Sequence, residues 1–183
     1  GNDRDFWINA DKGEKPWQAL AFCFEWAGFV REGYAFQSRL SVQMDGTCNG
    51  LQNFSAILRD AEGGAAVNLL PGDKPNDIYM DVARLVAAQV ERDAMDDSNP
   101  ERAEVARGWI GKVTRSVTKQ PVMTLAYGAT QYGFSKMVFN NAVKPWHTQA
   151  KKDGSFFPWK GNGFDAATYM GRLIWECVGQ VVK

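Results

Sequence analysis

One helix with an ordered series of side chains is encoded by the stretch Arg115-Ser-Val-Thr-Lys119-Gln-Pro-Val-Met123-Thr-Leu-Ala-Tyr127-Gly128. Residues four apart lie nearly above one another on a helix, at about 6 Å per step. The stretch therefore predicts a stripe of two cations followed by two apolar groups, made of Arg115, Lys119, Met123 and Tyr127. Gly128 is expected to end the helix and to let another backbone approach closely.

The order of these side chains matches the polarity of a nucleoside triphosphate. Arg and Lys hold phosphates through charge-assisted hydrogen bonds, whereas a thioether and an aromatic ring suit a sugar and a base. The commoner origin of such a pattern is a solvated cationic face followed by ordinary core residues. The stripe alone does not decide between these two interpretations.

The bulk composition is that of a globular protein. The chain has 183 residues, of which 45% are hydrophobic and 23% charged, enough for one substantial core in one body or two lobes. Its 21 basic and 21 acidic side chains balance, so any contact with nucleic acid must be local. Three widely spaced cysteines, Cys23, Cys48 and Cys177, favour reduced, packed thiols in a cytoplasmic setting.

The sequence offers no sign of membrane insertion. It starts with the polar residues Gly-Asn-Asp-Arg-Asp, where a secretory signal would be apolar. No run of 18 apolar residues occurs, so we expect no membrane partner.

The hydrophobic pattern upstream of the stripe changes period. Residues 17–31 are apolar on nearly all sides and predict a buried helix. Residues 36–45 then alternate and predict a strand with one wet face. Asp45 lies on that wet face at the end of the strand, just before Gly46. Its carboxylate is either presented to a cleft or fills a turn, which is the commoner role of Asp before Gly.

Most of the remaining chain predicts helices. One should begin near Thr47 or Asn49, one of which can cap it, and another should follow a cap at Asn76. Gly63-Gly64 predicts a loop between them. Pro100 suits the first turn of a helix, whereas Pro121 predicts either a kink or a helix start just before it. Residues 166–181 form the most regular apolar face.

Basic and aromatic residues are interleaved over residues 144–163, in particular Lys151 and Lys152 with Trp146 and Trp159. Such a mixture can bind single-stranded nucleic acid by charge and stacking. A surface loop anchored by its aromatic residues explains it equally well.

Two stretches of the chain stand out together: Asp45-Gly-Thr-Cys-Asn-Gly50-Leu-Gln-Asn-Phe-Ser-Ala-Ile-Leu-Arg-Asp60 and Arg115 to Gly128. They resemble the first two catalytic motifs of single-subunit bacteriophage RNA polymerases, which are relatives of the mitochondrial enzyme. Four shorter stretches are similar in the same order: Ala21-Phe-Cys-Phe-Glu, Ala66-Val-Asn-Leu-Leu-Pro71, Asp77-Ile-Tyr and Tyr169-Met-Gly-Arg-Leu-Ile-Trp-Glu. The resemblance covers nearly the whole chain.

This resemblance implies an α+β fold that is mostly helical and forms part of the right-hand polymerase shape. Residues 1–60 would be a palm portion, with a strand, a turn and a helix that carry the first motif. Residues 61–183 would be a fingers portion that carries the nucleotide-binding helix.

The resemblance also assigns roles. Asp45, Lys119 and Tyr127 would be the catalytic residues, and Asp45 with the Gly46 carbonyl would ligate Mg²⁺ in a two-metal site. Lys119 would stabilise charge on the phosphates, and Tyr127 would lie by the sugar and the templating position. The substrate-binding set would be Arg115, Lys119, Met123, Tyr127, Gly128 and Gly50.

Two glycines and a second tyrosine complete these expectations. Gly50 would leave room for the ribose 2′-hydroxyl, where related bacterial DNA polymerases carry a Glu that blocks it. Tyr132, with Gly133 beside it, would contact nucleic acid and help to part the downstream duplex.

The implied function is DNA-templated RNA synthesis, a nucleotidyl transfer from ribonucleoside triphosphates in the cytoplasm of a phage-infected bacterium or, alternatively, in the mitochondrial matrix. The implied partners are a DNA template, the RNA product, the ribonucleoside triphosphates and the remainder of the polymerase. A DNA polymerase is disfavoured by Gly50.

The chain departs from the family pattern in several places, one of which is a loop between Val90 and Trp109 that is shorter than in the best-known members. Asn53 stands where phage relatives usually carry His. The third motif, a His-Asp pair that supplies the second metal-binding carboxylate, is absent, because the one histidine, His147, is followed by Thr148. We therefore expect an incomplete core fragment that is inactive alone. The alternative is a non-catalytic module of polymerase ancestry that binds nucleic acid or a protein partner.

Overall fold

The computed structural model describes residues 15–42 and 44–181, in two compact units that consist of residues 1–45 and residues 46–183. Every regular element in these described ranges is a helix. The expectation of a mostly helical chain is therefore confirmed. The assignment of residues 1–60 to a palm and 61–183 to fingers stays a prediction, because compactness does not identify either.

The first unit contains the predicted helix, as α2 (Pro16–Glu32), followed by the short 3₁₀ helix η2 (Gly33–Ala35). Its predicted burial is not reached within this unit alone and otherwise stays a prediction. Gly28 is the buried residue of α2, whereas Trp17 and Phe24 are 74% and 71% exposed. A helix that is apolar all round needs neighbours on every side, and the described part of this unit offers only the short segment that follows it.

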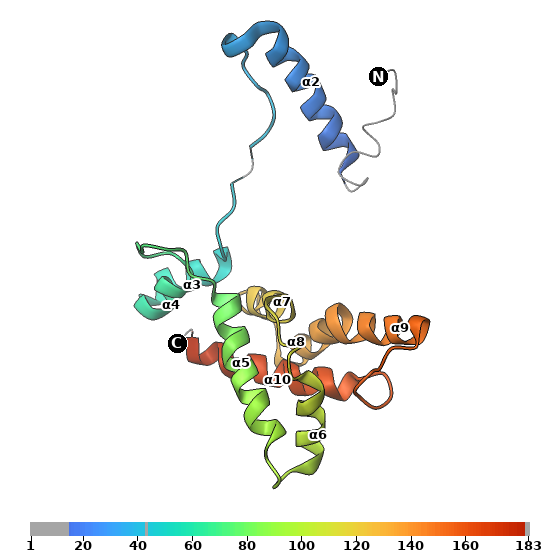
Figure 1. Ribbon diagram of the computed structural model, residues 1–183. Coiled ribbons are helices and arrows are strands. Elements are labelled where there is room, and N and C mark those ends of the chain that lie inside the picture. The colour runs from blue at the N-terminus through green and yellow to red at the C-terminus, as the bar shows by residue number, and fades with distance from the viewer. Residues whose placement is uncertain (1–14, 43, 182–183) are drawn as a thin grey trace. The chain divides into compact units, whose positions relative to one another are not determined.

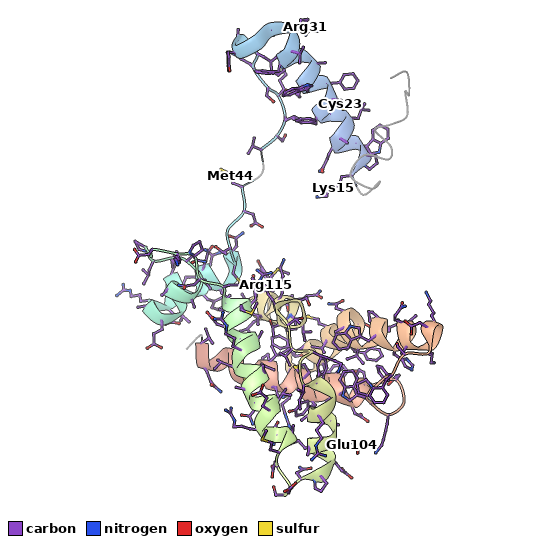
Figure 2. The ribbon with its side chains drawn as sticks, in the orientation of Figure 1. Lys15, Cys23, Arg31, Met44, Glu104 and Arg115 are labelled. Carbon is purple, nitrogen blue, oxygen red and sulfur yellow. The ribbon has the colours of Figure 1, made fainter. Side chains whose placement is uncertain are left out.

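The aromatic rings of α2 pack partly on one another. The ring centroids of Phe22 and Trp26 are 6.2 Å apart, and those of Trp26 and Phe29 are 5.5 Å apart. Figure 2 shows aromatic side chains along this helix, on which Cys23 and Arg31 are labelled. Gly28 admits the ring of Phe36, since a Cβ at Gly28 would lie 2.3 Å from a ring carbon.

The predicted strand over residues 36–45 is wrong within the described part of the chain. Residues 36–42 and 44–45 have no regular structure, although Phe36 is extended. A strand requires a neighbouring strand to pair its backbone groups. Here the N–H of Arg39 donates to Glu25 at 2.9 Å and that of Leu40 to Ser38 at 3.2 Å, both side-chain acceptors. The expected β component of an α+β fold is therefore not seen.

The second unit contains the hydrophobic core, whose buried apolar residues all lie at or after Cys48. Its helices in chain order are α3 (Asn49–Leu58), α4 (Ala61–Ala66), α5 (Ile78–Ala94), α6 (Pro100–Trp109), α7 (Arg115–Leu125), α8 (Gln131–Val138), the π-helix η3 (Phe139–Val143), α9 (Lys144–Asp153) and α10 (Phe164–Val181). Figure 1 shows their arrangement.

Helix α10 organises this unit, and its regular apolar face is buried in the core. Met170, Leu173 and Ile174 are fully buried, and α10 packs chiefly on α8 and crosses α5 (Figure 1). Gly171 lets α8 approach closely, because a Cβ there would lie 2.6 Å from the backbone nitrogen of Ser135. The indole N–H of Trp109 on α6 donates to the carbonyl of Ala166 at 3.1 Å.

Two of the expected helix boundaries differ in the structure. Helix α4 includes Gly63 and Gly64, which were predicted to form a loop. Asp60 caps α4 by accepting a hydrogen bond from the N–H of Gly63 at 3.0 Å. A Cβ at Gly63 would lie 2.3 Å from the Asp60 carboxylate. Glycine at position 63 therefore makes room for the Asp60 carboxylate and does not form a turn. Cys48, not Thr47 or Asn49, occupies the cap position of α3.

Pro121 lies inside α7, which runs from Arg115 to Leu125, so the helix does not start just before this proline. Further on, residues 144–153 are helical rather than part of a mixed loop. The aromatic residues there form a packed cluster: the ring centroids of Trp109 and Trp159 are 4.8 Å apart, and those of Trp146 and Trp159 are 6.0 Å apart. This packing favours an anchored segment over a stacking surface for bases.

None of the helices in the described ranges is long and apolar enough to cross a bilayer.

Candidate nucleotide-binding site

The predicted stripe lies on the exposed face of α7 and on the turn that follows this helix. The opposite face of this helix is buried through Val117, Thr118, Pro121 and Val122. On the stripe, Arg115 is partly exposed, Lys119 is exposed, and Met123 and Tyr127 are 39% and 72% exposed. The unit therefore presents all four side chains on a surface rather than placing the apolar pair in its core.

The end of α7 is formed as the sequence predicts. The helix stops at Leu125, and Tyr127 lies in the turn that follows. Gly128 has φ of +80°, a conformation that favours glycine, and its N–H donates to the carbonyl of Leu125 at 3.1 Å.

Arg115, labelled in Figure 2, begins α7 and is held by the first turn of α5. Its Nε donates to Oδ2 of Asp77 at 2.6 Å, and its guanidinium lies 5.0 Å from the centroid of the Tyr79 ring. Burial raises the pKa of Asp77, but the hydrogen bonds from Arg115 and from the backbone of Met80 and Tyr79 outweigh it and hold that pKa below its usual value.

Tyr79 connects three segments of the second unit. Its hydroxyl donates to the carbonyl of Thr47 at 3.3 Å, and its own carbonyl accepts a hydrogen bond from Thr118 at 2.8 Å. Burial and a hydrogen bond with Cys48 raise the pKa of Tyr79. The loop before α3, the start of α5 and the buried face of α7 are thus fixed to one another.

A cavity of about 260 Å³ opens beside these contacts. Thr47, Cys48, Asn68, Asp77, Tyr79 and Arg115 are among the residues that line it. It shares its wall with the cationic end of the stripe, since Arg115 belongs to both.

Gly50 and Tyr127, predicted to serve the sugar, are neighbours in the structure. A Cβ at Gly50 would lie 2.6 Å from the Cβ of Ala126 and 3.5 Å from the hydroxyl oxygen of Tyr127. The first turn of α3 therefore packs directly on the turn that ends α7, and the absence of a side chain at Gly50 permits it.

Tyr132 and Gly133 lie in the first turn of α8. Tyr132 is 59% exposed, with Nζ of Lys136 4.9 Å from its ring centroid. The N–H of Gly133 donates to the hydroxyl of Thr130, which caps the helix. Tyr132 lines a cavity of about 550 Å³ together with Arg102 and Arg172.

Asp45 is the last residue of the first unit and Gly46 is the first of the second. Asp45 and the stripe therefore belong to different units, and their combination in one site stays a prediction. In the described ranges, no three His, Cys, Asp or Glu side chains gather as a metal site would require. One carboxylate and one carbonyl are ligands that suit Mg²⁺, but they do not complete its coordination.

Sequence patterns missed two residues of this arrangement, Asp77 and Tyr79. Asp77, not the predicted Asn76, caps α5 by accepting hydrogen bonds from the N–H groups of Tyr79 and Met80. Both residues are candidate caps by type, and Asn76 instead bonds to Asn68 and Ala65. The available signal was an Asp directly before an apolar periodic run.

Comparison with known proteins shows similarity along the whole chain. Residues 2–183 match the family described as DNA-dependent RNA polymerase. The DNA-directed RNA polymerase of Enterobacteria phage T3 is 38% identical over 197 residues, which covers 97% of this chain and 21% of the relative. T7 RNA polymerase of Escherichia phage T7 is 38% identical over 200 residues, which covers 98% of this chain and 22% of the relative.

Mitochondrial proteins are similar over a shorter range. The mitochondrial DNA-directed RNA polymerase of Mus musculus is 46% identical over 132 residues, which covers 71% of this chain and 10% of the relative. The chain thus spans about a fifth of the length of the two phage relatives.

Proposed function

Because this chain belongs to the family of single-subunit, phage-type DNA-directed RNA polymerases, we propose that it supplies the binding site for the incoming ribonucleoside triphosphate in DNA-templated RNA synthesis. The single observation that carries this proposal is the exposed stripe on α7, which presents two cations and then two apolar groups. If the pattern were only a solvated cationic face followed by core residues, Met123 and Tyr127 would be buried. Both are exposed.

In this proposal each member of the stripe contacts a different part of the nucleotide. Arg115 and Lys119 bind the triphosphate, and Lys119 stabilises the charge that develops on its phosphates. Met123 and Tyr127 contact the sugar and the base, with Tyr127 next to the templating position. Gly128 allows the backbone to approach the substrate.

Gly50 would select ribose. Because Gly50 has no side chain, the turn that carries Tyr127 packs directly against it, and no side chain at this position projects toward a ribose held by Tyr127. A bulky side chain here would displace this turn and obstruct the 2′-hydroxyl, so glycine supports ribonucleotides over deoxyribonucleotides.

Asp45 and the Gly46 carbonyl would be ligands of Mg²⁺, which when bound neutralises charge on the reacting phosphate oxygens. The family uses this metal, and these residues fit part of its shell. We propose that the second carboxylate comes from outside these 183 residues, since His147 is followed by Thr148 and no His-Asp pair occurs. The chain alone would then bind nucleotide without joining it to RNA.

Nucleic acid would be bound near the start of α8. Tyr132 and Gly133 would contact the template, and Tyr132 would help to part the downstream duplex. Arg102 and Arg172 line the same cavity as Tyr132, and two guanidinium groups suit a phosphate backbone. Residues 1–60 would belong to the palm and residues 61–183 to the fingers.

The phage relatives align over 97% and 98% of the chain and the mouse mitochondrial relative over 71%, which supports action in an infected bacterium over action in mitochondria.

The second candidate function is a non-catalytic module that binds nucleic acid or a partner. The observation that favours it is that the sequence lacks the His-Asp pair of the third motif.

Titration with a fluorescent ribonucleoside triphosphate in the presence of Mg²⁺ tests the proposal. Lys119→Ala should weaken binding about tenfold or more, since hydrogen bonds to charged groups contribute about 1.5–3 kcal/mol. Lys151→Ala, which removes an exposed charge on α9, is the matched control and should bind as the wild type does. Equal affinities of all three proteins would overturn the proposal.

Two further experiments distinguish the two candidate functions. If the wild type binds the ribonucleotide only with Mg²⁺ and Asp45→Asn no longer responds to Mg²⁺, the result supports a polymerase site. If the chain binds DNA but no nucleotide, the result supports the non-catalytic module. On an RNA-primed DNA template with ribonucleotides, the 183-residue chain should not extend the primer. Extension would contradict our proposal that another carboxylate is required.

A further inference from the structure

We propose that Asp77 is a positioning residue that fixes the guanidinium of Arg115 for the triphosphate, with the Tyr79 ring as the surface against which this guanidinium rests. The inference builds on the proposed function, because it assigns to α5 the task of aligning a phosphate-binding group on α7. The three side chains come from two helices that meet at their N-terminal ends.

The carboxylate of Asp77 is itself held in place. Its Oδ1 accepts hydrogen bonds from the N–H groups of Tyr79 at 3.1 Å and Met80 at 3.2 Å. These two bonds leave Oδ2 to point at Arg115, whose Nε lies 2.6 Å away. One carboxylate therefore caps α5 and orients the arginine at the same time.

This geometry leaves the phosphate-binding part of Arg115 available. Among the described residues, the one hydrogen bond of its guanidinium is made through Nε. An arginine has five N–H donors, so the four on its two Nη atoms remain for a ligand. Those four form the fork that matches the oxygens of a phosphate.

Tyr79 restricts the guanidinium from a second side. Its ring is 3% exposed and lies 5.0 Å from the Arg115 guanidinium carbon. The hydroxyl of Tyr79 is bonded to Thr47, and its carbonyl is bonded to Thr118. Because hydrogen bonds hold both its hydroxyl and its carbonyl, the Tyr79 ring is a fixed support. Arg115 is therefore ordered before any ligand binds. Such preorganisation lowers the entropic cost of binding.

Stability alone does not account for this pair. The side chains of Arg115 and Asp77 are 42% and 40% exposed, and ion pairs with that exposure stabilise a fold weakly. The cap and the ion pair also use different oxygens of Asp77, so a substitution can remove one and keep the other. Asn is as good a cap as Asp, but a neutral amide is a poor partner for a guanidinium.

The test compares Asp77→Asn with Asp81→Asn in the 183-residue chain. Asp81 lies one turn further along α5 and forms an exposed ion pair with Arg84 at 3.2 Å, so its substitution removes the same charge and a similar contact. Asp77→Asn should weaken binding of a fluorescent ribonucleoside triphosphate about three- to tenfold, as expected when an ordered side chain becomes mobile. Asp81→Asn should leave binding unchanged, and both variants should unfold at the wild-type temperature.

A double-mutant cycle with Arg115→Ala identifies the route of the effect. If Asp77 acts through Arg115, Asp77→Asn should have no further effect in the Arg115→Ala background. Affinity for a ribonucleoside, which lacks all the phosphates that Arg115 could hold, should be the same in wild type and Asp77→Asn. Additive losses in the cycle, or equal losses for both ligands, would overturn the inference.

The outcomes separate this inference from the proposed function. If Lys119→Ala and Arg115→Ala weaken triphosphate binding but Asp77→Asn behaves like Asp81→Asn, the inference is overturned and the function stands. If neither Lys119→Ala nor Arg115→Ala changes binding, the proposed function itself fails. A readout without ligand is hydrogen exchange of the Arg115 Nε–H by NMR, which should be faster in Asp77→Asn; an unchanged rate would contradict the inference.

Discussion

At Gly50 the space that a side chain would need is filled by the methyl group of Ala126. A Cβ at Gly50 would come within 2.6 Å of that methyl, closer than two carbon atoms can pack. The contact joins the first turn of α3 to the turn after α7, so this glycine has a packing role in addition to the proposed one at the ribose.

We predict that Gly50→Ala destabilises the chain by about 1–3 kcal/mol, the usual cost of overpacking, and lowers its unfolding temperature. Ala126→Gly in the same chain should recover part of the loss, because it removes the methyl that clashes. Thermal unfolding followed by circular dichroism measures both. A double variant no more stable than Gly50→Ala would show that this contact is not the cause.

At the residue scale, the sequence predicted which side chains of α7 share a face, because spacing on a helix determines that directly. It did not predict the partner of Arg115. Asn76 and Asp77 are both good caps, and only the folded chain shows that Asn76 is bound by Asn68 while Asp77 caps α5 and meets Arg115. Contacts between residues 38 positions apart are not encoded in local spacing.

At the scale of elements, α8 and α10 form the most extensive helix pair among the described residues. A Cβ at Gly171 would lie 2.6 Å from the nitrogen and 2.7 Å from the Cα of Ser135. These are backbone atoms, so relief of the clash requires one helix to move away from the other.

Gly171→Ala should therefore cost at least about 1–3 kcal/mol in the free energy of unfolding. Gly179→Ala in the same helix is the matched control, because a Cβ there meets nothing within 4 Å. That substitution should stabilise α10 by about 0.5–1 kcal/mol, since glycine is the weaker helix former. Urea denaturation of both variants gives the comparison, and equal stabilities would refute the proposed close approach.

Periodicity predicted most helices but not what covers them. Helix α10 is apolar on one face and buried there, whereas α2 is apolar nearly all round and its own unit covers little of it. The alternation over residues 36–45 likewise indicates a side-chain pattern, but a strand needs a partner, and Val42 and Met44 remain 86% and 94% exposed. Burial and pairing depend on distant segments, which a local pattern does not contain.

At the scale of the whole molecule, one buried carboxylate joins three helices of the second unit. Asp93 on α5 accepts hydrogen bonds from Gln89 at 2.7 Å, from Arg102 on α6 at 2.9 Å and from Tyr169 on α10 at 2.6 Å. Burial raises the pKa of Asp93, but these hydrogen bonds outweigh it and lower the pKa below its usual value.

A lowered pKa in the folded state means that the ionised form of Asp93 stabilises the fold. This contribution is complete above the pKa of an unfolded Asp, about 3.9, and is lost as the pH falls through the lower pKa of the folded state. Asp93→Asn should thus cost about 1.5–3 kcal/mol at neutral pH, the size of hydrogen bonds to a charged group.

In acid the difference in the free energy of unfolding between wild type and Asp93→Asn should shrink, because the Asp93 carboxylate of the wild type becomes protonated. Denaturant unfolding at pH 7 and at about pH 3 measures the change, with Asp97→Asn, an exposed carboxylate, as the control. A difference that stays constant between the two pH values would contradict this role of Asp93.

The position of α10 also has a consequence for the order in which the protein is made. Ribosomes complete the chain from its N-terminus, so α10 is the last of the described elements to emerge, although α5 and α8 both pack on it. At about 5–20 residues per second, α5 waits on the order of 10 s for this partner. During that interval its apolar face has no intramolecular cover from α10, and a nascent chain would depend on chaperones to keep that face from aggregating.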